Sequence, residues 1–125
     1  MKLSPLQVEP GALAALANEA CMLLVAGEFA RLATKFGYAV ALGRDPASAI
    51  KEDFGTSLAD LGEASLSLKA DPEVQLRYFK PDEHLYALAE CSVFTARGCR
   101  LSVELVVSRV GNDFHATLEQ ISAVA

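Results

Sequence analysis

The chain has 125 residues, a hydrophobic fraction of 52% and a formal net charge of -5. This length and apolar content predict a single folded domain over residues 1–125 and argue against disorder. The acidic balance argues against nucleic acid as a partner, because binding to phosphates needs a basic surface, and it favours a basic protein or a neutral small molecule.

The N-terminal segment predicts two helices. Apolar residues in 12–26 recur at helical spacing behind Pro10, and Gly27 predicts the end of that helix. Residues 27–37 repeat the pattern and end at a second glycine. The first segment is too short, and too interrupted by polar residues, to cross a membrane. It is also a poor signal peptide, so we expect a cytoplasmic protein without a membrane partner.

The next segment predicts a connection and a third, short helix. Residues 38–42, "YAVAL", fit either a short strand or a buried connection. Asp45 is a predicted N-cap with Pro46 in the first helical position. We expect this helix to end at Gly55.

The second half of the chain changes to a period of two residues, which is typical of strands. The segments 64–69 and 74–80 alternate, and longer strand candidates follow at 85–95, 99–110 and 114–124. Hairpin signals separate the last three. The predicted class is therefore α+β, with N-terminal helices packed on one face of a curved antiparallel β-meander of four to five strands.

The turns fix the register of these strands. A two-residue turn at 111–112 places Leu105 opposite Leu118, and a three-residue loop at 96–98 places Cys91 opposite Val103. One face then becomes an apolar layer for the helices, and Tyr78 and Cys91 are its polar members. The alternation slips at 119–120, which predicts a bulge that turns Ile121 and Ala123 inward.

The opposite face combines an acidic row with an apolar strip. The same register brings three carboxylates together on adjacent strands, although opposed like charges destabilise a sheet. We interpret this face as a contact surface for self-association, with a homodimer expected, or for a basic protein. A site for a divalent cation and a plain solvated face relieved by Arg77 and Arg100 are the alternatives. The predicted contact residues are Phe79, Tyr86, Leu88, Glu90, Glu104, Val106 and Glu119.

The cysteines predict free thiols in a reducing cytoplasm, because Cys21, Cys91 and Cys99 are odd in number and lack metal-type spacing. The register separates Cys91 from Cys99 too widely for a disulfide. It also places no histidine beside Cys91, which argues against a nucleophilic role. His84 lies in the predicted exposed turn 81–84, which we read as a turn rather than a metal site. We expect neither a metal nor another cofactor.

The order of elements resembles the NTF2-like (cystatin-like) α+β cone superfamily. "LVAGEFARLATKF" is similar to its second-helix region, "GRDPASAIKEDF" to its third helix and "NDFHATLEQIS" to its last strand. The chain is also similar to small bacterial proteins with a comparable C-terminal meander. The superfamily resemblance implies a pocket between the helices and the sheet, which catalytic members line with an acid, a base or a histidine. Here that face offers only Tyr78 and Cys91.

Two hypotheses follow. The first is a non-catalytic protein-interaction module that acts through the outer sheet face. The alternative is a small-molecule binder, or an isomerase- or cyclase-type enzyme, with Tyr78 and Cys91 in the pocket. We favour the first, because the predicted pocket face carries no acid, base or histidine.

Overall fold

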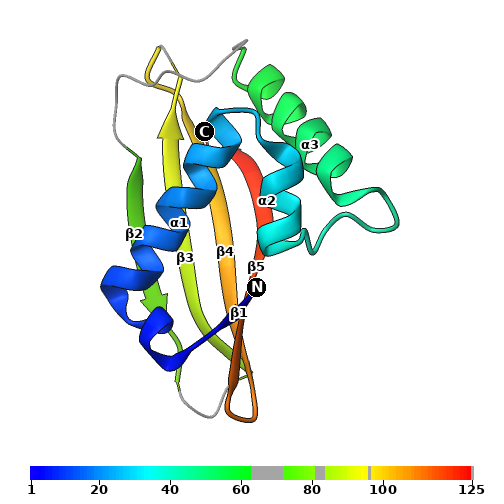
Figure 1. Cartoon of the computed structure of the whole chain (residues 1–125). Helices are drawn as coiled ribbons and strands as arrows, with labels where there is room; N and C mark the ends of the chain where they lie inside the picture. Colours follow the sequence, from blue (N-terminus) through cyan, green and yellow to red (C-terminus); the bar gives the residue numbers. More distant parts are fainter. Residues whose placement is uncertain (63–71, 81–83, 96, 125) are drawn as a thin grey trace.

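The computed structural model describes residues 1–62, 72–80, 84–95 and 97–124 and confirms the α+β class. The helices lie on one face of a curled antiparallel sheet of five strands (Figure 1). The elements in chain order are β1 (Lys2–Leu3), the 3-10 helix η1 (Pro5–Val8), α1 (Pro10–Val25), α2 (Phe29–Phe36), α3 (Pro46–Asp60), β2 (Glu73–Tyr78), β3 (Leu85–Phe94), β4 (Arg100–Val110) and β5 (Asp113–Val124). The predicted strand at 64–69 and most of the predicted turn at 81–84 lie outside the described residues.

The third helix is longer than the sequence predicts. Asp45 caps its N-terminus as expected, because the carboxylate accepts a hydrogen bond from the backbone N–H of Ser48 at 3.0 Å. Gly55 does not end it, and the helix continues to Asp60. A glycine inside a helix costs about 1 kcal/mol relative to alanine. The turn that follows buries Ser57 and Leu58, and that packing outweighs the local preference.

The predicted register of the sheet is confirmed. The strand order is β1-β5-β4-β3-β2, and Leu105 pairs with Leu118 while Cys91 pairs with Val103. At the edge of the sheet Tyr78 pairs with Ala87, as the spacing across the turn predicts. The helices therefore cover the expected apolar face.

Two irregularities shift the alternation of side chains. Between β4 and β5 the pairing passes from Glu104–Gln120 to Leu105–Leu118, so Glu119 is the extra residue of the predicted bulge. Ile121 is buried as expected. The second irregularity, between Leu85 and Ala87, was not predicted.

The outer edge of β5 pairs with two segments that the sequence does not identify as strands. β1 pairs with β5 at Lys2–His115, and the N–H of Ala39 donates to the carbonyl of Leu118 at 2.9 Å. Tyr38 also forms an isolated bridge with Leu118, so "YAVAL" is a connection and not a regular strand. It is only partly buried, because Tyr38 and Ala41 are buried while the other three residues are exposed. These contacts leave β2 as the open edge of the sheet among the described residues.

The prediction that all cysteines are free thiols is wrong for two of them. Cys21 on α1 and Cys91 on β3 form a disulfide with a Cα–Cα distance of 6.6 Å. Both residues are fully buried, because α1 packs directly across β3. Cys99 is free, and no bond joins it to Cys91, as the register predicts. Among the described residues, no helix has the length and hydropathy needed to cross a bilayer.

Candidate functional site

The outer sheet face, opposite the helices, is the surface that the sequence predicts to be functional. None of the described helices or strands lies on it (Figure 1). The register arranges its side chains in rows across the strands, because paired residues share a face. One row contains Leu88 opposite Val106, and the next contains Glu90 opposite Glu104. The site is thus an apolar row beside an acidic row.

The acidic row centres on Glu104. Glu90 on β3 is its direct cross-strand partner. On β5 the direct partner is Gln120, not Glu119, so the prediction that the three glutamates form one strict row needs correction. Glu119 is the bulge residue beside Gln120 and remains close enough to act electrostatically. Partial burial, then the charges of Glu90 and Glu119, raise the pKa of the Glu104 carboxyl above its ordinary value.

No cation neutralises this row within the described residues. None of the ion pairs there involves Glu90, Glu104 or Glu119. Arg77 instead places its guanidinium over the ring of Phe79, with 5.2 Å to the ring centroid. Arg100 pairs along the sheet with Phe94 and Val124. The sequence-based idea that Arg77 and Arg100 relieve the acidic charge has no ion pair to support it.

The apolar strip is smaller than the sequence predicts. Leu88 and Val106 face each other and are half-buried, and Phe79 lies beyond them under Arg77. Tyr86 does not belong to this face, because the irregularity at residues 85–87 turns it toward the helix side. Its ring contacts that of Phe114 at 4.7 Å between centroids, and it packs against the buried core.

Tyr78 and Cys91, the predicted pocket residues, have other roles in the structure. The Tyr78 hydroxyl donates to the backbone carbonyl of Val8 at 2.7 Å, and its ring packs edge-on against Tyr86. The Cys91 sulfur is bonded to Cys21 and is inaccessible. Neither side chain lines the groove at residues 19–35, the groove at residues 53–60 and 121–123, or the groove at residues 30–47. The two residues therefore act as core and rim contacts.

Sequence reasoning missed a polar network that fastens the loop before α3. The Tyr38 hydroxyl donates to Asp53 Oδ2 at 2.5 Å, and Arg44 Nη1 lies 3.1 Å from Asp53 Oδ1. These two donors hold the pKa of the Asp53 carboxyl below its ordinary value, and burial together with Asp53 raises the pKa of Tyr38. Asp53 lies between Ala49 and Ser57 at helical spacing, so an acid on a buried helix stripe was the available signal.

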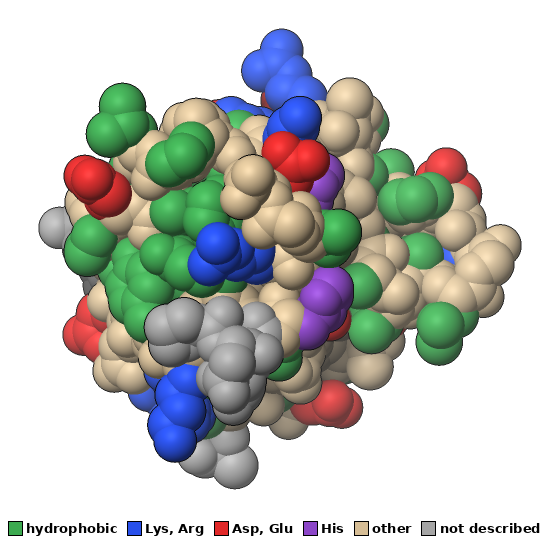
Figure 2. Space-filling view, turned by 90° about the horizontal axis from the view of Figure 1, so that it is seen from below, with side chains coloured by type: hydrophobic (Ala, Val, Ile, Leu, Met, Phe, Trp, Pro, Cys, Tyr) green, Lys and Arg blue, Asp and Glu red, His purple; other side chains and the backbone are tan. Residues whose placement is uncertain are grey.

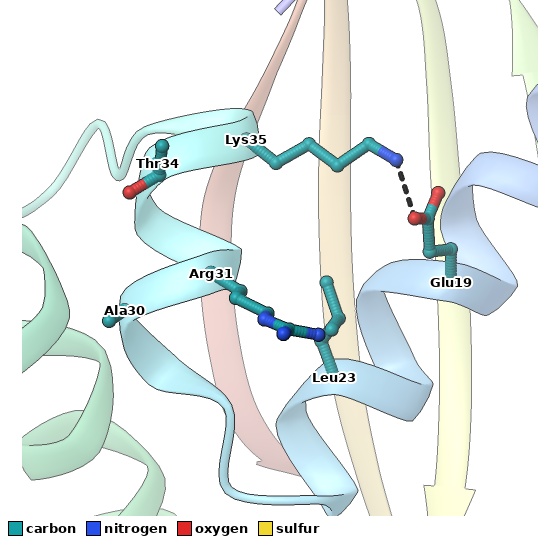
Figure 3. A pocket seen from close by; sticks show the side chains of 6 residues that line it. All are labelled: Glu19, Leu23, Ala30, Arg31, Thr34 and Lys35. Atoms are coloured by element: carbon teal, nitrogen blue, oxygen red, sulfur yellow. Dashed lines mark hydrogen bonds and ion pairs between the residues drawn. The ribbon is translucent and has the colours of Figure 1, made fainter.

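A shallow groove of about 420 Å³ lies between α1 and α2 (Figure 3). Lys35 on α2 reaches across to an ion pair with Glu19 on α1, and Arg31 points toward Leu23. The groove has an apolar wall and a fully paired lysine, and it brings together no acid–base pair or activated nucleophile for catalysis. The ion pair between Lys35 and Glu19 thus fastens α2 to α1.

The lower end of the sheet carries further apolar surface. Figure 2 views this end and shows hydrophobic side chains gathered beside Lys or Arg side chains. Exposed apolar residues come from η1, from the adjoining ends of β2 and β3 and from the end of β4: Leu6, Tyr78, Leu85 and Val110. Arg109 covers part of the end by lying over the ring of Phe114. This surface lies around the contacting rings of Tyr78, Tyr86 and Phe114, which cover this end of the core.

The described part of the chain contains no group of three or more His, Cys, Asp or Glu residues that could hold a metal ion. Comparison with known proteins gives no further assignment: no family model, curated protein or solved structure matches the chain. The case for a function therefore depends on the geometry of the outer sheet face.

Proposed function

We propose that this chain is a non-catalytic binding module that holds a basic protein partner on its outer sheet face. The observation that carries the proposal is the position of Glu104. It is partly buried, lies between Glu90 and Glu119, and forms no ion pair among the described residues. A lysine or arginine from a partner would supply the missing charge, and the apolar row beside it would add contact area.

The energetics favour a partner over a merely solvated row. Each pair of opposed like charges destabilises a sheet by about 0.2–1 kcal/mol. Burial adds to this cost by removing water from Glu104, as its raised pKa indicates. A cation placed between Glu90 and Glu104 offsets both the repulsion and the desolvation. Relief of these two costs therefore contributes to the free energy of binding.

Self-association through this same face is less favourable. Two copies meeting face to face would bring two acidic rows together, and neither row has a described cation to separate the charges. The predicted apolar contact of Leu88 and Val106 would have to overcome that repulsion. We therefore assign the face to a basic partner and treat self-association separately below.

The test uses an oligolysine peptide of about ten residues as a cationic probe, because the proposed site recognises the positive charge of a partner's side chains. Its affinity is measured by fluorescence anisotropy for the wild type and for Glu90→Gln/Glu104→Gln. The matched control is Glu9→Gln/Asp60→Asn, which removes the same net charge at exposed positions away from the face. We expect the face variant to lose at least tenfold in affinity and the control to lose much less.

Equal weakening in the two double variants would contradict the proposal, because binding would then follow net charge and not the acidic row. Binding should also weaken as salt rises, since dissolved ions screen exposed charges over a length of about 8–10 Å at ordinary ionic strength, and this length shortens as salt is added. A salt-independent affinity would equally argue against charge recognition.

The NTF2-like resemblance remains part of the proposal, supported by helices that cover one face of a curled meander. The bacterial origin remains a prediction, whereas the cytoplasmic location predicted from the sequence conflicts with the disulfide. The disulfide between Cys21 and Cys91 favours an oxidising compartment over the cytoplasm. The alternative of a small-molecule site at Tyr78 and Cys91 has no supporting observation in the described residues.

A further inference from the structure

We infer that the chain forms a symmetric homodimer by pairing the open edge of β2 with the same edge of a second copy. This inference does not depend on the proposed basic partner. β2 is the last strand of the sheet, and within the described residues its outer side pairs with no other strand. An uncovered edge is a template for another strand, so proteins usually cover or disrupt it.

The backbone of β2 fixes which residues can pair across the edge. The N–H of Phe79 donates to the carbonyl of Tyr86 on β3 at 2.9 Å. Successive residues of an antiparallel strand point their N–H and C=O groups to opposite sides. Gln75 and Arg77 therefore bond to β3, while Val74 and Leu76 point their backbone groups to the free edge.

An antiparallel pairing between two copies must use those outward groups, so Val74 and Leu76 must occupy hydrogen-bonded positions. A two-fold axis at Gln75 meets this requirement, because Val74 of each copy then faces Leu76 of the other. The same register places Glu73 of each copy opposite Arg77 of the other, in the closer, non-hydrogen-bonded positions. Two ion pairs and two apolar pairs thus form together by symmetry.

The exposure of the side chains fits this arrangement. Glu73, Gln75 and Arg77 are exposed on the outer face, and Glu73 has no ion pair among the described residues. Val74 and Leu76 pack against the edge of the core and are only half-buried. A second copy would cover both. An axis at Leu76 also satisfies the backbone, but it sets Glu73 against Phe79 and loses both ion pairs.

The first test is charge reversal, measured by sedimentation velocity over a concentration series. We expect Arg77→Glu and Glu73→Arg each to weaken dimerisation at least tenfold, because each places two like-charged pairs across the axis. The double variant Glu73→Arg/Arg77→Glu restores opposite charges and should recover the dimer. A wild type that stays monomeric at the highest concentration, or a double variant that does not recover, overturns the inference.

The second test reports the register directly. In a Cys99→Ser background, Gln75→Cys places one thiol opposite its counterpart on the axis, at the Cα separation of a non-hydrogen-bonded pair, where a disulfide can form. Leu76→Cys is the matched control, because its counterpart in the second copy is Val74 and it keeps both ion pairs. We expect oxidation to cross-link the first variant and not the second. A dimer that resists Arg77→Glu and does not cross-link at residue 75 uses another surface and refutes the pairing.

Discussion

Reduction of the Cys21–Cys91 disulfide is expected to destabilise the fold strongly. The bond joins residues separated by 70 positions and closes α1 onto the middle of the sheet. In the chain-entropy model a closed loop of this length stabilises the folded state by about 4 kcal/mol, because the unfolded chain loses conformational freedom. For a domain of this size that corresponds to a fall in melting temperature of about 10–20 °C on reduction.

The assay combines thermal melting with thiol counting. Protein purified without reductant is unfolded in guanidinium and titrated with a chromogenic thiol reagent, which should detect only Cys99 before reduction and all three cysteines after it. Cys99→Ser is the matched control, because removal of the free thiol should leave the reductant-dependent change in melting temperature intact. A Cys21→Ala/Cys91→Ala variant should melt low with or without reductant.

Three reactive cysteines in the untreated protein, together with a melting temperature that ignores reductant, would refute the disulfide. That result would return the chain to the free-thiol prediction and remove the argument for an oxidising compartment. A single reactive cysteine with little change in melting would instead show that the bond forms but that the unfolded state is already compact.

Three further outcomes are expected from urea or thermal unfolding of single variants. Tyr38→Phe should lower the free energy of unfolding by about 1.5–3 kcal/mol, because it removes a hydrogen bond to the Asp53 carboxylate, and an unchanged midpoint would contradict that contact. Leu42→Asn should raise stability by about 0.5–1 kcal/mol, because Leu42 is 87% exposed at a φ of 53°, which asparagine tolerates better, and a loss would show that the loop depends on the leucine. Glu104→Gln should raise stability at neutral pH by about 0.2–1 kcal/mol. Because the folded-state pKa of Glu104 is raised, the ionised carboxylate destabilises the wild type only above its ordinary pKa, and this cost develops as pH rises through the raised value. The stability gained by Glu104→Gln should therefore disappear on acidification. A gain that does not depend on pH would contradict this cause.

The register of the sheet could be predicted because its turns leave little choice. Gly111 adopts a positive φ in the predicted turn, and the pairing of β4 with β5 follows from that turn. The bulge at Glu119 was also visible, because the apolar spacing changes between Leu118 and Ile121. The irregularity at Tyr86 gives no such signal, since residues 85–89 are all apolar and no change of spacing is visible among them, and so Tyr86 was assigned to the wrong face.

Contacts that depend on how helices dock could not be predicted in the same way. The sequence places Cys21 in the first predicted helix and Cys91 on the inner sheet face, yet it does not say where along the sheet α1 crosses. The network of Tyr38, Arg44 and Asp53 similarly depends on the packing of α3 beside β5. Helical period indicates which side of a helix is buried but not the residue that it meets.

The proposed dimer axis and the proposed binding site for a basic partner lie on the same row of side chains across the sheet. Gln75 pairs with Glu90, and Glu90 pairs with Glu104, so a two-fold axis at Gln75 aligns the acidic rows of both copies along one continuous sheet face. Neighbouring strands lie about 4.8 Å apart, which keeps the acidic rows of the two copies within reach of a single extended basic segment. Such a segment would bind bivalently and more tightly than to either copy alone. Because Arg77→Glu separates the two copies, it should reduce the advantage in affinity that a long cationic probe has over a short one. Loss of Glu90 and Glu104 should instead weaken the binding of both probes.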